Sequence, residues 1–378
     1  MKIMFSAGET SGDLHGANLA REILQMDSTV ELIGFGGSQM QQAGVRLYKN
    51  FSDYNIMGVW EVIKNLRRIL KLLDELEDFA RREKPNLLVL IDYPDFNWRL
   101  AKRIKKLGIP IFSYIPPSAW AWRKGRAKDC AEIADEFVAI FPFELPVYQD
   151  AGANISFVGN PLVDSVQTSM SQDESRKFFG VQDEPIILLM PGSRRQEIDR
   201  LLPVMIESAE LIAKKNPRTR FFLPVAIDGI EKFTSKSKIK IELVTEHRYD
   251  LFSIADAAIA TSGTVVLEAA LLDLPCVIVY KMAAFNFLIA KLFVHVKFFS
   301  LPNILLDESI QPELLQSEVT PERITEEISK LFKGNPNRDK VVRDLRRACK
   351  KLGHRGSARR VAEKIYYAAE SYKIKDRL

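Results

Sequence analysis

Residues 3–13 read IMFSAGETSGD, a short apolar run that ends in a glycine-containing turn. A helical pattern follows directly, so we expect the turn to join the carboxyl end of a strand to a helix, the edge at which open α/β sheets bind ligands. Small residues there let a ligand approach the backbone, and Thr10 or Ser11 is expected to cap the helix. We therefore place Gly8 and Ser11 on the ligand side of a parallel sheet, with a plain tight turn as the alternative.

The same alternation of apolar runs and helical patterns continues along the chain, as βαβ units require. The candidate strands form two series, the first at residues 3–7, 30–35, 86–91, 109–115, 137–141 and 155–158, the second at 186–190, 220–225, 239–244, 257–260 and 276–280. Residues 62–82 carry the apolar stripe of a helix, and the polar segment 160–179 with its early proline is typical of a linker. We predict α/β domains at 1–165 and 166–340, followed by helices at 341–378 that cap the second domain, cross back to the first or swap between subunits.

Bulk properties narrow the class of protein. A chain of 378 residues exceeds what one hydrophobic core usually serves, which agrees with two domains. The net charge of +5 suits a small anionic ligand or a membrane surface and is too low for a protein that binds nucleic acid. The apolar run at the N-terminus is too short for a signal peptide, and charged residues interrupt the longest apolar stretches. We therefore expect no membrane-spanning helix.

Several common sites do not fit the sequence. Residues 34–39 lack the last glycine of the dinucleotide fingerprint, and Asp13 stands where a phosphate-binding Walker loop requires lysine. The four histidines and three cysteines are not spaced as metal ligands. Hydride transfer and NTP hydrolysis are thus disfavoured, and we expect neither a metal ion nor a cofactor.

The third predicted strand delivers Asp92 at its carboxyl end, within the run IDYPDFN at 91–97. A carboxylate at the mouth of an apolar strand is partly desolvated, which raises its affinity for a proton and suits it to act as a general base. Asp95 precedes a predicted helix at 96–107, and we interpret it as the N-cap.

An aromatic loop follows the fourth predicted strand. It contains Trp120, Trp122 and Arg123 within PSAWAWR, residues 117–123. Aromatic faces beside a cation suit sugars, phosphates or acyl chains, although both tryptophans could instead fill a core under the loop. Residues 282–301 alternate aromatic side chains with lysines in a similar way, which fits either an interfacial segment or a buried helix.

The second predicted domain has two strand-to-helix turns that suit a diphosphate. The strand at 186–190 leads into PGSR at 191–194, where Ser193 and Arg194 precede a helix. The strand at 257–260 leads into a second helix start with Ser262, Gly263 and Thr264. Free N–H groups at helix starts bind anions, and an arginine beside them can bind a phosphate with two hydrogen bonds. Glu268 lies one turn further, where it could accept hydrogen bonds from ribose hydroxyls, unless it is only a solvated helix residue.

These motifs together resemble those of lipid A disaccharide synthases, a family of glycosyltransferases. The motifs that carry the resemblance are AGETSGD at 7–13, IDYPDFN at 91–97, PSAWAWR at 117–123, PGSR at 191–194, SGT at 262–264 with Glu268, and SLPN at 300–303. They lie in both predicted domains. The sequence departs from the family at Asn160, where many members have histidine, and we assign this residue no role.

The resemblance implies a GT-B fold, in which two Rossmann-like lobes with parallel sheets face a central cleft. It also implies UDP-2,3-diacylglucosamine as the donor and 2,3-diacylglucosamine 1-phosphate (lipid X) as the acceptor, joined by a β-1,6 bond with inversion. Gly8 and Ser11 would then bind the donor, and Asn303 and the aromatic loop would lie on the acceptor side. Peripheral attachment to the cytoplasmic face of the inner membrane is implied as well, and whether the chain forms a homodimer is left open.

Our leading hypothesis is that Asp92 deprotonates the acceptor 6-hydroxyl while Arg194 and the helix start at 262–264 stabilise the departing UDP, with Glu268 on the ribose. One alternative is a UDP-sugar epimerase of the same fold, which would not need Trp120, Trp122 or the aromatic segment at 282–301. The other is a non-catalytic carrier of nucleotides or lipids, in which Asp92 is only structural.

Overall fold

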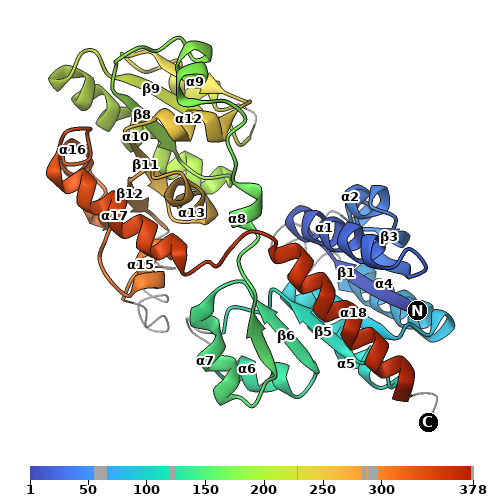
Figure 1. Ribbon diagram of the computed structural model, residues 1–378. Helices are drawn as coiled ribbons and strands as arrows, with labels where there is room; N and C mark the ends of the chain where they lie inside the picture. Colours follow the sequence, from blue (N-terminus) through green and yellow to red (C-terminus); the bar gives the residue numbers. More distant parts are fainter. Residues whose placement is uncertain (55–65, 120–123, 228, 283–286, 288–296, 376–378) are drawn as a thin grey trace. The chain divides into compact units, whose positions relative to one another are not determined.

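The chain consists of two compact units, each built around one parallel sheet (Figure 1). The computed structural model describes residues 1–54, 66–119, 124–227, 229–282, 287 and 297–375. The first unit comprises Met1–Pro161 and His354–Leu378, and the second comprises Leu162–Gly353. The predicted linker at 160–179 thus begins where the chain passes between the units, and it contains the short helices α8 (Leu162–Ser165) and α9 (Gln172–Phe178).

The first unit has a seven-stranded sheet in the order β3-β2-β1-β4-β5-β6-β7, with every pair parallel. Its strands are β1 (Lys2–Ala7), β2 (Glu31–Gly36), β3 (Arg46–Asn50), β4 (Leu87–Ile91), β5 (Ile111–Tyr114), β6 (Glu136–Ala139) and β7 (Ile155–Phe157). The order reverses between β1 and β4, as in doubly wound nucleotide-binding folds. Such a reversal is where these folds bind their ligands.

Helices cover both faces of this sheet because successive strand residues point to opposite sides. Ile3 and Phe5 of β1 belong to a core with α1 (Thr10–Met26) and α18 (Ser357–Lys375). Met4, between them, belongs to the core with α4 (Leu66–Glu83) and α5 (Pro94–Lys105). Among the described residues of the unit, the remaining helices are α2 (Ser38–Gln42), η1 (Phe51–Tyr54), α6 (Lys124–Ala131), η2 (Pro142–Glu144) and α7 (Leu145–Asp150).

The second unit repeats the plan with a six-stranded parallel sheet in the order β10-β9-β8-β11-β12-β13. Its strands are β8 (Ile186–Met190), β9 (Arg220–Pro224), β10 (Ile241–Val244), β11 (Ala257–Thr261), β12 (Cys276–Tyr280) and β13 (Glu313–Leu315). Its further helices are α10 (Arg195–Lys215), α11 (Glu231–Thr234), α12 (Arg248–Ile254), α13 (Thr264–Leu271), α15 (Leu301–Leu306), η3 (Gln316–Glu318), α16 (Pro321–Ser329) and α17 (Pro336–Lys350). The prediction of a two-unit parallel α/β fold with a helical C-terminus is confirmed.

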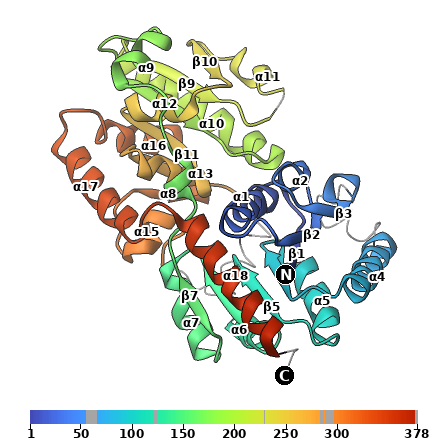
Figure 2. The ribbon, with the colours of Figure 1, turned by 45° about the vertical axis from the view of Figure 1, so that its right-hand side comes forward.

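The last two helices lie in different units. Helix α17 packs on α13 and α15 in the second unit, whereas α18 packs on α1 in the first (Figure 2). Buried Val361 and Ile365 of α18 join the core of the first sheet. The Arg360 Nε donates to the carbonyl of Val158 at 2.7 Å, and the Lys364 Nζ donates to Glu136 at 3.0 Å. The end of the chain therefore completes the first unit.

Three local predictions were wrong. Helix α1 begins at Thr10 with Glu9 at the N-cap, and neither Thr10 nor Ser11 caps it with its side chain. Helix α5 begins at Pro94, two residues before the predicted start, so Asp95 lies in its first turn and is not the N-cap. Its exposed carboxylate pairs with Arg126 at 2.9 Å instead. A proline is well tolerated at the first helical position, which explains the earlier start.

Candidate active site

The candidate residues of the first unit gather at one edge of its sheet. Gly8 and Ser11 follow β1, and Asp92 follows β4, which pairs with β1 in parallel. The carboxyl ends of these two strands meet where the strand order reverses, because Ala7 is the partner of Ile91. The structure therefore brings the AGETSGD turn and Asp92 together.

The turn that carries Asp92 has an unusual backbone. Asp92 and Tyr93 both adopt the left-handed region, with φ of 48° and 51°. Such conformations cost about 1–3 kcal/mol each in residues other than glycine and cluster at functional sites. Asn97 holds the turn, since its buried Nδ2 donates to the carbonyl of Asp92 at 2.7 Å and to that of Ser6 at 3.2 Å. The Ser6 hydroxyl in turn donates to the Asn97 Oδ1 at 2.6 Å.

The environment of Asp92 favours a proton-accepting carboxylate. Burial raises the pKa of this half-buried side chain above its ordinary value, and a hydrogen bond from the Tyr93 N–H opposes the shift. A carboxylate with a raised proton affinity is suited to act as a general base, which is the role predicted for Asp92.

Gly8 meets a side chain at very short range. A Cβ at Gly8 would lie 2.2 Å from the Cδ1 of Tyr93, so only glycine lets this ring rest on the backbone. Burial raises the pKa of Tyr93, and the carboxylates of Glu9 and Asp95 raise it further. Ser11 is exposed in the first turn of α1. In this structure the space above Gly8 is thus filled by Tyr93.

The second unit places its candidate residues at the equivalent edge. Gly192, with φ of 104°, turns the chain after β8, and α10 starts at Arg195. The side chains of Ser193 and Arg194 are exposed, that of Arg194 to 82%. The Arg194 Nη1 lies 3.4 Å from the Glu197 carboxylate, a weak contact that leaves most of the guanidinium open to a ligand.

The second helix start lies beside the first. Strands β8 and β11 pair in parallel with Met190 opposite Ala260, so α10 and α13 begin next to each other along the sheet edge. The Ser262 hydroxyl donates to the carbonyl of Phe299 at 2.7 Å, whereas Gly263 and Thr264 are exposed. Two helix starts and one arginine suit a diphosphate, because the first N–H groups of a helix have no partner within the helix.

Glu268 lies one turn into α13 and is largely buried. Its Oε2 lies 3.5 Å from the Arg248 Nη2, and Tyr249 donates a hydrogen bond to it. Burial raises the pKa of this carboxyl, while the charge of Arg248 and the bond from Tyr249 oppose the shift. The interpretation of Glu268 as a solvated helix residue is therefore wrong.

Comparison with known proteins decides the family. The sequence profile described as lipid-A-disaccharide synthetase matches residues 3–367 of the chain. The chain belongs to the lipid-A-disaccharide synthetase family. A lipid-A-disaccharide synthase of Syntrophus aciditrophicus is 40% identical over 368 residues, which cover 95% of this chain and 96% of that protein. One from Coxiella burnetii is 36% identical over 366 residues, covering 96% and 97%.

Solved structures share the fold with several activities. A UDP-GlcNAc 2-epimerase from Neisseria meningitidis bound to UDP-GlcNAc aligns with a TM-score of 0.67 and 13% identity, covering 97% of this chain and all of that one. A glycosyltransferase from Rickettsia africae aligns with a TM-score of 0.58 and 13% identity, covering 97% and 98%. At this identity the likeness establishes the GT-B type of fold alone. The sequence family, and not the fold, identifies this chain as a glycosyltransferase.

Asn303 belongs to a motif of the lipid-A-disaccharide synthetase family, and the structure buries it completely. Its Nδ2 donates to the carbonyl of Gln311 at 3.0 Å and to the Glu313 carboxylate at 2.9 Å. Its Oδ1 accepts from the N–H groups of Ile310 and Gln311 at 3.2 and 3.1 Å. All of its hydrogen-bonding capacity thus serves the loop before β13 and the first residue of that strand, and a contact with the acceptor stays a prediction.

Sequence reasoning missed two charged groups. Glu144 follows β6, is only 3% exposed and accepts a hydrogen bond from the Phe141 N–H at 3.2 Å. Burial raises its pKa to about 7, and the charge of Asp92 adds to the shift. Arg248, beside Glu268, comes from α12. No spacing in the sequence connects either residue to its partner, because each pair comes from different elements.

Some predicted residues lie outside the part of the chain that the structure describes. These are Trp120, Trp122 and Arg123 of the aromatic loop, the start of the helix predicted at 62–82, and most of the segment predicted at 282–301. Within the described residues, no cluster of three or more His, Cys, Asp or Glu could hold a metal ion. No helix among them is long and apolar enough to cross a membrane.

Proposed function

We propose that this enzyme transfers 2,3-diacylglucosamine from its UDP donor to 2,3-diacylglucosamine 1-phosphate, forming a β-1,6-linked disaccharide 1-phosphate and UDP. The observation that carries the proposal is the family match over residues 3–367. The fold neighbours include both epimerases and glycosyltransferases, so the fold is compatible with either reaction.

Asp92 acts as the general base in this mechanism. Its carboxylate takes the proton of the acceptor 6-hydroxyl as the oxygen attacks the anomeric carbon of the donor, and the bond from that carbon to the diphosphate oxygen breaks with inversion. The raised pKa of Asp92 supports this role. The strained turn held by Asn97 supports it as well, because it fixes the backbone from which the carboxylate projects.

The departing UDP gains a second negative charge on its terminal phosphate, and the second unit supplies groups to stabilise it. Arg194 donates to the diphosphate, and so do the N–H groups after Ser193 and at Ser262–Thr264. Glu268 accepts hydrogen bonds from the ribose hydroxyls, with Arg248 holding its carboxylate. We assign Gly8 and Ser11 of the first unit to donor binding, and we assign Trp120, Trp122 and Arg123 to acceptor binding, as the family motifs imply.

A direct assay separates this reaction from the two alternatives. The chain is incubated with both diacyl substrates, without added metal and then with a chelator, and the products are identified by mass spectrometry. A tetraacyl disaccharide phosphate supports the proposal. Conversion of UDP-N-acetylglucosamine to its 2-epimer, without disaccharide, would establish an epimerase, and binding of the substrates with no product would establish a carrier.

We further propose that the chain works on the cytoplasmic face of the inner membrane as a peripheral protein. Both substrates carry acyl chains, and the aromatic and lysine-rich segment at 282–301 suits an interface with anionic lipid. Co-flotation with vesicles that contain anionic lipid tests this attachment, and protein that stays at the bottom of the gradient would contradict it. Light scattering of the purified chain tests whether it is a homodimer.

A further inference from the structure

The second unit contains a cavity of about 490 Å³ that no step of the proposed mechanism uses. Its lining residues are Arg200, Lys281, Met282, Phe287, Gln316 and Ser317. They come from three places in the unit: the second turn of α10, the chain that leaves β12, and η3 after β13. A volume of this size is in the range of small-ligand pockets.

The cavity lies on the same sheet edge as the proposed diphosphate site. Strands β12 and β13 pair in parallel with Tyr280 opposite Leu315, so Lys281 and Gln316 leave the sheet side by side. Strand β11, which leads into the helix start at Ser262–Thr264, is the next strand along. Arg200 is five residues into the helix that Arg194 precedes, about 7.5 Å along its axis.

The two walls formed by Met282 and Gln316 are joined by reciprocal hydrogen bonds. The Met282 N–H donates to the Gln316 Oε1 at 3.1 Å, and the Gln316 Nε2 donates to the carbonyl of Met282 at 3.3 Å. Gln316 has a φ of 53°, a conformation that costs free energy in any residue other than glycine. The wall at Gln316 is therefore held in place despite an unfavourable backbone conformation of this residue.

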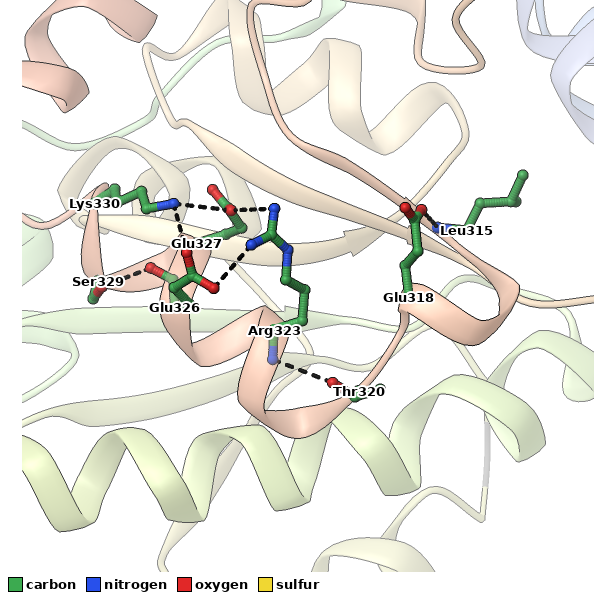
Figure 3. A network of polar contacts seen from close by, with 8 residues as sticks. All are labelled: Leu315, Glu318, Thr320, Arg323, Glu326, Glu327, Ser329 and Lys330. Carbon is green, nitrogen blue, oxygen red and sulfur yellow. Dashed lines mark hydrogen bonds and ion pairs between the residues drawn. The ribbon is translucent and has the colours of Figure 1, made fainter.

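Neighbouring contacts hold η3 in place. The Leu315 N–H donates to the Glu318 carboxylate at 3.1 Å, and Thr320 caps α16 through the N–H of Arg323 at 3.2 Å (Figure 3). Arg323 and Lys330 then pair with Glu326 and Glu327 along the helix (Figure 3). The wall formed by Gln316 and Ser317 thus leads directly into a helix that is capped and cross-linked by charge pairs.

The chemistry of the lining is that of an amphiphile site. Met282 and Phe287 are apolar, and methionine adapts its shape to flexible ligands. Arg200 and Lys281 have apolar stems with cationic ends, and in the described part of the chain neither lies within ion-pair distance of a carboxylate. An apolar chain attached to an anionic group would satisfy both features.

We propose that this cavity receives one acyl chain of the UDP-linked sugar donor. The inference rests on the proposed function for the identity of the donor. The diphosphate is anchored at the starts of α10 and α13, and the chain extends along the sheet edge into the cavity between α10, Met282 and η3. The cavity then selects donors by acyl length, while the nucleotide site selects UDP.

Donor binding measured by calorimetry tests the site without relying on turnover. The ligands are UDP and a series of UDP-2,3-diacylglucosamines of increasing acyl length. For the wild-type chain we expect the donor affinity to rise roughly fourfold with each methylene that enters the cavity, until the cavity is filled. Met282→Trp places a bulkier side chain at the cavity wall and narrows the space for an acyl chain. It should therefore lose most of this rise and bind the long-chain donor at least tenfold more weakly, with an unchanged UDP affinity.

Two further variants make the result decisive. Met170→Trp introduces the same side chain at another half-buried methionine of the second unit, outside the cavity, and should keep the wild-type length dependence. Met282→Ser shortens the apolar wall without adding bulk, so it should flatten the dependence, and it decides the question if Met282→Trp does not fold. An unchanged length dependence in the folded Met282 variants overturns the proposal.

The same series separates this inference from the proposed function. If the wild-type chain forms no disaccharide but its donor affinity depends on acyl length and on Met282, the cavity assignment stands and the reaction is wrong. If it forms disaccharide with equal length dependence in the wild type and both Met282 variants, the reaction stands and the cavity assignment is wrong.

Discussion

Replacing Asp92 with asparagine isolates its proposed role as a base. The left-handed turn should survive the change, because Asn97 bonds to the carbonyl of Asp92 and not to its carboxylate. The Asn Oδ1 can still accept the hydrogen bond that the Tyr93 N–H makes to the Asp92 side chain. The variant thus keeps the shape and the backbone bonds and loses only the capacity to take a proton.

The size of the effect follows from what a positioned base contributes. General base catalysis is worth typically 10²–10⁴ in rate, or about 2.7–5.4 kcal/mol of transition-state free energy. We expect Asp92→Asn to lower kcat at least a hundredfold and to change the affinity for UDP less than about twofold, because the proposed UDP site lies in the second unit. The free energy of unfolding should change by less than about 1 kcal/mol, since no buried bond is lost.

The pH profile gives a second measure of the same role. Asp92 is active when deprotonated, so wild-type kcat/KM should fall as the pH drops through its pKa. Burial raises that pKa, so the fall should begin above the ordinary value of 3.8 for aspartate. The residual activity of Asp92→Asn should lack this acidic limb.

The assay is disaccharide formation from both diacyl substrates, with kcat and KM measured at several pH values. Asp95→Asn is the matched control, because Asp95 is exposed in the first turn of α5 and pairs only with Arg126 among the described residues. We expect this control to stay within about twofold of the wild type. A variant Asp92→Asn with near wild-type kcat and an unchanged acidic limb would refute the assignment.

Three further variants test the surroundings of the site. Arg194→Ala should weaken UDP binding, measured by calorimetry, roughly 10- to 100-fold, because a hydrogen bond to a charged group is lost. The control is Arg195→Ala, which should keep the UDP affinity near that of the wild type, because the Arg195 guanidinium pairs with Asp199. Asn97→Ala should lower the free energy of unfolding in urea by about 1–3 kcal/mol and reduce kcat, because the carbonyl of Asp92 loses its buried donor. An unchanged midpoint of urea unfolding would contradict this prediction. The folded-state pKa of Glu144, about 7, lies above its ordinary 4.5, so the protonated form stabilises the fold below pH 4.5 and this stability is lost as the pH rises through 7. In the wild type, the free energy of unfolding should therefore fall by on the order of 3 kcal/mol between pH 4.5 and pH 7, and Glu144→Gln should remove this fall. Equal pH dependence of unfolding in the wild type and the variant would show that Glu144 is not the titrating group.

The interior strands of both sheets were predictable because they are continuous apolar runs. Strands such as β4, LLVLI, are covered on both faces in a parallel sheet, and this burial requires apolar residues at every position. The edge strand β3, RLYKN, was missed because it pairs on one side only and is partly exposed, so polar residues are tolerated. Strand β13, of three residues, was missed for the same reason.

The sequence by itself determined the two-unit α/β class, the family, and the positions of Asp92 and Arg194, because the turn that follows a buried strand must lie at the carboxyl edge of its sheet. Tertiary structure alone decided the rest. It coupled Glu144 to Asp92, set Arg248 against Glu268, directed the amide of Asn303 inward and sent α18 to the first unit. Each of these depends on contacts and burial between elements far apart in the chain, which local residue patterns do not encode.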